Sequence, residues 1–80
     1  MSHNKIIYII DDEVSVCTTL KDVFQFAGFV VHVFDNPFLA FESKLEIQNS
    51  CILLDLSMPE MSGIEFQKRL HKKQIHIPIV

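Results

Sequence analysis

The chain has few positive charges and few cysteines, and each shortage excludes a class of function. Its seven Lys and Arg stand against ten Asp and Glu, for a formal net charge of −3, and they form no continuous basic stripe. Binding to nucleic acid depends on such a stripe, so we expect no direct nucleic-acid contact from this segment. Cys17 and Cys51 each lie inside an apolar run, and two cysteines are too few for a disulfide framework or a zinc site. We expect two reduced thiols.

The sequence also lacks long apolar runs. No stretch approaches the roughly 18 apolar residues of a membrane-spanning helix, and the N-terminal Met-Ser-His-Asn-Lys does not have the pattern of a signal peptide. We therefore expect a cytoplasmic protein without membrane contact. At 80 residues, the chain is shorter than a usual domain of roughly 100 to 200 residues. We expect residues 1–80 to form one domain that is incomplete at its C-terminal end.

Short apolar runs predict buried parallel strands, and the first of them is also rich in β-branched residues. These runs cover residues 6–10, 29–34 and 51–54, and a fourth strand is expected to start over residues 77–80. The seven phenylalanines of the chain are expected to lie in the core. Because Pro78 and the residues around it leave an apolar strand at the sheet edge, pairing with another chain is expected there.

Helices are predicted between the strands. Apolar residues at three- and four-residue spacing favour an amphipathic helix over residues 14–27, with Gly28 at its C-terminal cap. Asn36-Pro37 favours the start of a second helix whose apolar stripe includes Phe38, Phe41 and Leu45, and Ser62 favours the start of a third that carries Ile64, Phe66 and Leu70. Alternating strands and helices predict an α/β fold, a three-layer, doubly wound parallel sheet with right-handed crossovers.

Three carboxylates follow two of the predicted strands. Asp11 and Asp12 end the first strand, and Asp55 ends the third. Ligands of open parallel sheets bind beyond the carboxyl ends of the strands, so the three side chains converge if these two strands are neighbours. Crowded carboxylates favour a divalent cation, and oxygen ligands suit Mg²⁺, to which the backbone carbonyl of Ser57 could contribute.

Asp55 is the best candidate nucleophile of the three. It stands alone at the end of its strand with a loop behind it, while Asp11 and Asp12 are better arranged to hold a metal. An ionised Asp beside a metal can attack phosphorus and form an acyl phosphate. The competing interpretation is that these residues only cap helices or lie in solvated loops. It explains less well why two such sites occur one strand-helix repeat apart.

Two motifs carry a resemblance to a known family. Ile-Ile-Asp-Asp-Glu at residues 9–13 and Leu-Leu-Asp-Leu-Ser-Met-Pro-Glu-Met-Ser-Gly at residues 53–63 are similar to those of two-component response-regulator receiver domains, which have a flavodoxin-like fold. The resemblance covers essentially the whole chain in order and spacing. From Met58 onward the motif looks most like the transcriptional regulators of the nitrogen-fixation type.

The resemblance implies a role for each site residue. Asp55 would be the phosphoacceptor, with a sensor histidine kinase as phosphodonor. Asp12, Asp55 and the carbonyl of Ser57 would contact Mg²⁺, and Asp11 would act through water. Met58-Pro59 and Gly63 would shape the loop of the site.

The resemblance also implies what a complete receiver contains beyond these residues. A Thr or Ser would end strand four, a Lys on strand five would bind the phosphoryl oxygens, and an output domain would control transcription. The truncated sheet would pair with a second copy or exchange strands. No catalytic activity is expected beyond self-phosphorylation and self-dephosphorylation in the complete domain.

Two other functions stay open at this point. One is a degenerate receiver that serves only as a docking or dimerisation module. The other is an aspartate-dependent phosphohydrolase of the haloacid-dehalogenase type. In that class the nucleophile usually follows the first strand, with a second Asp two residues later, and Asp11-Asp12-Glu13 lacks that spacing.

Overall fold

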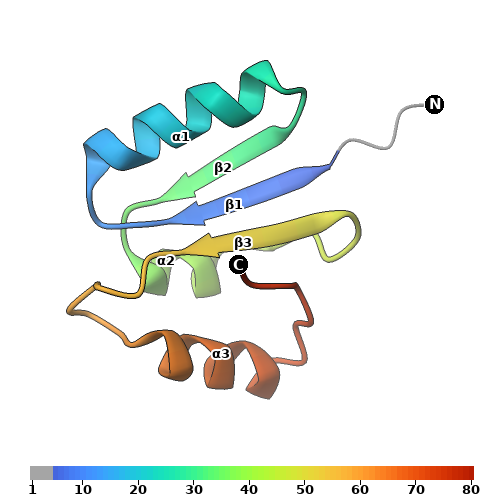
Figure 1. Cartoon of the computed structure of the whole chain (residues 1–80). Coiled ribbons are helices and arrows are strands. Elements are labelled where there is room, and N and C mark those ends of the chain that lie inside the picture. The colour runs from blue at the N-terminus through green and yellow to red at the C-terminus, as the bar shows by residue number, and fades with distance from the viewer. Residues whose placement is uncertain (1–4) are drawn as a thin grey trace.

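A parallel sheet between two layers of helices makes up the structure, a computed structural model that describes residues 5–80 (Figure 1). Its elements follow in the order β1 (Ile6–Ile10), α1 (Val14–Phe26), β2 (Val30–Phe34), α2 (Pro37–Glu42), β3 (Ser50–Leu54) and α3 (Gly63–Lys72). The strand order is β2-β1-β3, so β1 is central and the chain crosses over it between β2 and β3. The predicted α/β class is confirmed.

The two strand pairs of the sheet are in the same register. Ile6 of β1 lies opposite Val30 of β2 and Ser50 of β3, and the pairing continues residue by residue to the end of β1. All three strands therefore end at the same level. The residues that follow them lie along one edge of the sheet, which is where ligands of such sheets bind.

Each face of the sheet has its own apolar core, because successive side chains of a strand point to opposite faces. Helix α1 covers one face, and α2 and α3 cover the other (Figure 1). The α1 face buries Ile7, Ile9, Cys17 and Val31. The core on the opposite face is larger and includes Tyr8, Ile10, Ile52, Leu54, Ala40, Phe66 and Leu70. The predicted three-layer arrangement is confirmed.

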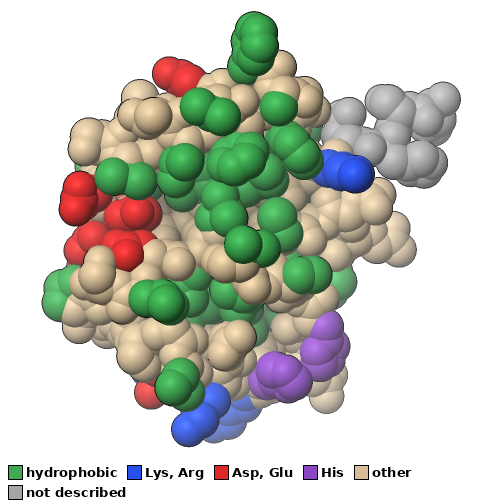
Figure 2. Space-filling model, viewed as in Figure 1, with side chains coloured by type: hydrophobic (Ala, Val, Ile, Leu, Met, Phe, Trp, Pro, Cys, Tyr) green, Lys and Arg blue, Asp and Glu red, His purple; other side chains and the backbone are tan. Residues whose placement is uncertain are grey.

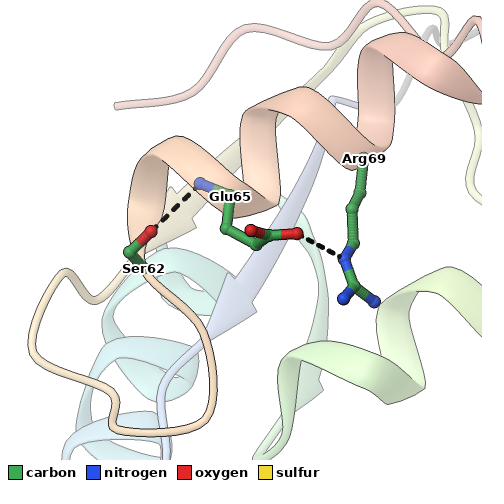
Figure 3. A network of polar contacts seen from close by, with 3 residues as sticks. All are labelled: Ser62, Glu65 and Arg69. Atoms are coloured by element: carbon green, nitrogen blue, oxygen red, sulfur yellow. Dashed lines mark hydrogen bonds and ion pairs between the residues drawn. The ribbon is translucent and has the colours of Figure 1, made fainter.

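The predicted helix caps are present. The Asn36 side chain accepts a hydrogen bond from the Phe38 amide at 2.8 Å, and Ser62 Oγ accepts one from the Glu65 amide at 3.1 Å (Figure 3). Helix α1 ends at Phe26 with Ala27 as its C-terminal cap, one residue earlier than predicted, and the next residue, Gly28, has a φ of 99°. Its amide donates to the Gln25 carbonyl in a left-handed turn that glycine adopts without steric cost.

Two predicted elements differ from the structure. Helix α2 ends at Glu42 because Ser43 is extended, so Leu45 reaches the core from a loop rather than from the helix. Residues 77–80 form one isolated bridge to β3 rather than a strand. The Ile52 amide donates to the Pro78 carbonyl, and the Val80 amide donates to the Ile52 carbonyl. Pro78 has no amide hydrogen and adds no donor to this pairing.

Some apolar side chains that were expected in the core lie at the surface. Phe26 at the end of α1 is 96 % exposed, and Ile64 in the first turn of α3 is 67 % exposed. Phe26 is two residues after Phe24, which packs on the core, and Ile64 is two residues before the buried Phe66. Two residues correspond to about 200° around a helix, so each exposed side chain points away from the core. Among residues 5–80, no helix combines the length and the apolar character that crossing a membrane requires.

The residue that follows the C-terminal cap of α3 has a strained backbone, which provides a test of the fold. Gln74 has a φ of 60°, and its amide donates to the His71 carbonyl at 2.9 Å. This is the turn that Gly28 makes in α1, and a side chain there costs about 1 kcal/mol. We expect Gln74→Gly to raise the free energy of unfolding by about 0.5–1 kcal/mol in urea denaturation.

Gln67→Gly is the matched control, because Gln67 is an exposed residue inside α3. It should lower the free energy of unfolding by about 1 kcal/mol. A loss of stability in both variants would contradict the strain at Gln74.

Candidate functional site

The structure brings the three predicted carboxylates together. One carboxylate oxygen each of Asp11, Asp12 and Asp55 lies within 4.8 Å of the others. The backbone extends the sheet one residue beyond the strands. The Asp55 amide donates to the Ile10 carbonyl at 3.0 Å, and the Asp11 amide donates to the Phe34 carbonyl at 3.1 Å. The cluster therefore lies at the carboxyl edge of the sheet, where red side chains gather on the left of Figure 2.

Asp11 is fixed by contacts to the first turn of α1. Its Oδ1 accepts a hydrogen bond from the Glu13 amide at 2.9 Å, and its carbonyl accepts one from Cys17 Sγ at 3.2 Å. Burial raises the pKa of the Cys17 thiol, and the negative charge of Asp11 raises that pKa further. The thiol therefore stays protonated and remains a donor. This contact of Cys17 was not predicted from the sequence.

Asp55 is held by Ser57. Its Oδ1 accepts hydrogen bonds from the Ser57 amide at 3.0 Å and from the Ser57 hydroxyl at 2.8 Å. The amide contact, followed by the hydroxyl contact, lowers the pKa of Asp55 below its usual value, and the side chain of Asp11 adds to this shift. Asp55 is therefore ionised at neutral pH.

The hydroxyl of Ser57 is a contact that sequence reasoning missed. Ser57 was expected to contribute only its backbone carbonyl. The signal was the Asp-x-Ser spacing, because an Asp side chain readily accepts from the backbone amide two residues later. A hydroxyl at the same position is then close enough to donate to the same oxygen.

The loop between β3 and α3 is anchored in the core. Met58 and Met61 are each 5 % exposed and pack in the cluster that contains Phe66. At Gly63, where α3 begins, a Cβ atom would lie only 2.5 Å from Leu56 Cδ2. The predicted loop residues therefore do contribute to its shape, since two methionines hold it down and Gly63 leaves room for Leu56.

The donor set of the cluster fits Mg²⁺. Magnesium takes oxygen ligands in octahedral geometry at about 2.0–2.1 Å, so its ligand atoms lie roughly 3 to 4 Å from one another. The carboxylate oxygens, within 4.8 Å of one another, reach this spacing by small side-chain rotations. Asp11, Asp12 and Asp55 are thus the residues that could hold such an ion.

Comparison with known proteins identifies the family. Residues 7–80 match the response regulator receiver domain. The chain belongs to this family. Nodulation protein W of Bradyrhizobium diazoefficiens is 30 % identical over 79 residues, which are 99 % of this chain and 35 % of that protein. The transcriptional regulatory protein FixJ of the same organism is 32 % identical over 74 residues, 92 % of this chain and 36 % of that protein. This receiver chain spans about a third of the length of these relatives.

Solved structures have the same fold as this receiver domain. The response regulator StyR has a TM-score of 0.87 and 37 % identity, over 98 % of this chain and 39 % of that chain. The N-terminal part of FixJ has a TM-score of 0.82 and 32 % identity, and the match covers 98 % of this chain and 62 % of that chain. TrrA of Thermotoga maritima was solved in complex with Mg²⁺ and beryllofluoride. It has a TM-score of 0.78 and 27 % identity, and the match covers 94 % of this chain and 65 % of that chain. The predicted flavodoxin-like receiver fold and the similarity to nitrogen-fixation regulators are confirmed.

The Ser57 contacts predict how Asp55 titrates. In Ser57→Ala the hydroxyl donor is lost and the amide donor remains, so the pKa of Asp55 should rise part of the way towards its usual value. The stabilisation by ionised Asp55 is lost as pH falls through its folded-state pKa, and the variant should lose it at a higher pH. Carboxyl ¹³C NMR titration measures the shift.

Ser43→Ala is the control, since the Ser43 hydroxyl donates to the Leu39 carbonyl and makes no contact with Asp55. It should leave the pKa of Asp55 unchanged. An unchanged Asp55 pKa in Ser57→Ala would contradict the role of the hydroxyl.

Proposed function

We propose that this receiver domain accepts a phosphoryl group from a sensor histidine kinase on Asp55. Mg²⁺ would be held by Asp11, Asp12, Asp55 and the backbone carbonyl of Ser57, with Asp11 acting through water. The observation that supports this best is the convergence of three carboxylates within 4.8 Å at the ends of β1 and β3. The TrrA complex with Mg²⁺ and beryllofluoride supports the choice of metal.

The contacts of Asp55 suit a nucleophile. Both Ser57 donors meet Oδ1, so Oδ2 has neither contact and is the oxygen that attacks phosphorus. The new bond joins Oδ2 to phosphorus as the bond from phosphorus to the donor histidine nitrogen breaks. The electron pair of that broken bond stays on the imidazole, and the product is an acyl phosphate. Mg²⁺ held by Asp11, Asp12 and Asp55 would offset the negative charge of the incoming phosphoryl group.

The other two carboxylates are better suited to the metal. Asp11 is held through its Oδ1 and its carbonyl by contacts to residues of the α1 turn, which fixes its position. Asp12 follows it directly and contributes the third oxygen of the cluster. This arrangement favours the signalling domain over the phosphohydrolase alternative, as does the receiver-domain match over residues 7–80.

The relatives support a proposal for the wider role. FixJ is a transcriptional regulatory protein, and this chain spans 36 % of its length. We propose that the 80 residues are part of a longer cytoplasmic regulator, in which the receiver continues past this segment and an output domain controls transcription. For the segment of residues 1–80 taken alone, we propose pairing of two copies or strand exchange through the exposed edge of the sheet.

Phosphorylation is tested directly. On incubation with acetyl phosphate and Mg²⁺, the chain should gain the mass of one phosphoryl group, and Asp55→Asn should gain none. The control Asp22→Asn changes an exposed aspartate of α1 and should react as the unchanged chain does. Equal labelling of Asp55→Asn would overturn the assignment of the nucleophile. No labelling of any form would favour the degenerate docking module.

Metal binding is tested separately. Asp12→Asn removes one charged oxygen ligand and should weaken Mg²⁺ binding by about tenfold, roughly 1.4 kcal/mol. Amide NMR shifts during a Mg²⁺ titration measure the affinity. Asp22→Asn should bind Mg²⁺ as the unchanged chain does, and an unaltered affinity in Asp12→Asn would contradict its place among the ligands.

A further inference from the structure

We propose that a groove between α2 and α3, called here the cationic groove, binds an acidic segment of a partner polypeptide that carries an apolar anchor. The groove has a volume of about 760 Å³. Phe38 and Phe41 of α2 form its apolar surface. The basic residues of α3 and its C-terminal cap line the opposite side, namely Lys68, Arg69, Lys72 and Lys73. None of the carboxylates of the phosphoacceptor site lines it, so this proposal goes beyond the proposed function.

The apolar surface of the groove is rigid and open to solvent. Phe41 packs on the fully buried Phe66, with ring centroids 4.9 Å apart. Phe38, one turn earlier on α2, is 42 % exposed. Phe41, which packs on the core, and the exposed Phe38 together offer contact area for an apolar side chain.

Contacts to α2 hold the side chains of Arg69 and Lys73 at the edge of the cationic groove. Arg69 Cζ lies 5.4 Å from the centroid of Phe38, and Glu65 binds Arg69 Nε at 3.0 Å. Figure 3 shows both side chains on the side of α3 that faces the α2 ribbon. Lys73 Nζ lies 5.7 Å from the centroid of Phe41 and donates to the Phe41 carbonyl at 2.9 Å. These positions are therefore set before any ligand binds.

The charge of the groove is opposite to that of the chain. Four of the seven Lys and Arg line it, although the chain as a whole has a net charge of −3. Within residues 5–80, Lys68 and Lys72 form no ion pair. Figure 2 shows blue side chains at the lower edge of the molecule, away from the red cluster of the phosphoacceptor site. The amines of Lys68 and Lys72 are therefore available to carboxylates of a ligand.

The groove fits a polypeptide better than a nucleic acid. Glu42 and Glu65 also line it, so that its four cations and two carboxylates give a formal charge of +2 and not a purely basic surface. The same carboxylates can accept hydrogen bonds from peptide amides, which a nucleic-acid backbone does not offer. Mixed charges around an aromatic surface are typical of protein interfaces, whereas nucleic-acid sites need a predominantly basic surface.

A dye-labelled peptide tests the proposal by fluorescence anisotropy. The probe is a short peptide in which a Leu-Phe pair is flanked by glutamates, and a second probe has Ser-Ser in place of Leu-Phe. The unchanged chain should bind the first probe saturably and the second about tenfold more weakly. The double variant Lys68→Glu, Lys72→Glu should weaken binding of the first probe by about tenfold or more, and binding should fall with added salt.

Controls distinguish binding in the cationic groove from nonspecific electrostatic attraction and from loss of folding. Lys21→Glu changes an exposed lysine of α1 and should bind the probe as the unchanged chain does. Phe38→Ser tests the aromatic surface and should weaken the Leu-Phe probe more than the Ser-Ser probe, with circular dichroism verifying that each variant is folded. Asp55→Asn should keep full peptide affinity, so failure at the phosphoacceptor site leaves this result intact.

Several outcomes would overturn the proposal. These are a lack of saturable binding, equal affinity for the two probes, or equal losses in Lys21→Glu and the double variant. Tighter binding of a DNA duplex, lost in the same double variant, would assign the groove to nucleic acid instead.

Discussion

The parallel pairing of β1 with β3 is the constraint on which the rest of the structure depends. It places Ile10 opposite Leu54, so that Asp11 and Asp55 leave the sheet side by side. A slip by one residue would shift Asp55 by about 3.3 Å along the strand and turn Ile52 and Leu54 away from the core. The same register therefore fixes both the apolar layer and the distances between the carboxylates.

This pairing brings the carboxylates of Asp11, Asp12 and Asp55 close together. The burial of apolar side chains elsewhere has to offset the repulsion between them. Met58 and Met61 are buried on either side of the exposed loop residues Pro59 and Glu60. Burying each methionine contributes about 1.5–3 kcal/mol. The loop behind Asp55 is thus held by the core, while the carboxylates keep contact with solvent. A site built in this way favours cations without requiring the fold to rearrange.

Sequence patterns predicted the elements whose signals are local. Short apolar runs indicated the strands, and Asn36 and Ser62 indicated helix caps, because each signal depends on neighbours within a few residues. The convergence of Asp11, Asp12 and Asp55 followed from strand order, which the sequence suggested but did not establish. What could not be predicted depends on distant packing, such as the early end of α2 and the burial of Leu45 from a loop. Phe26 is a different case, because its burial was expected from its aromatic character, whereas helical spacing turns it about 200° from Phe24, which packs on the core.

The unequal division of the core has a consequence for how the molecule opens. Within residues 5–80, helix α1 buries only Cys17 of its own residues and covers a cluster of four buried side chains, whereas the opposite face buries eleven. Local opening costs least where the least apolar surface is exposed. The amide hydrogens of α1 should therefore exchange with solvent sooner than those of β1 and β3. The Cys17 thiol donates a hydrogen bond to the Asp11 carbonyl. Each opening of α1 therefore breaks a contact that holds Asp11 in the carboxylate cluster, while the sheet stays folded.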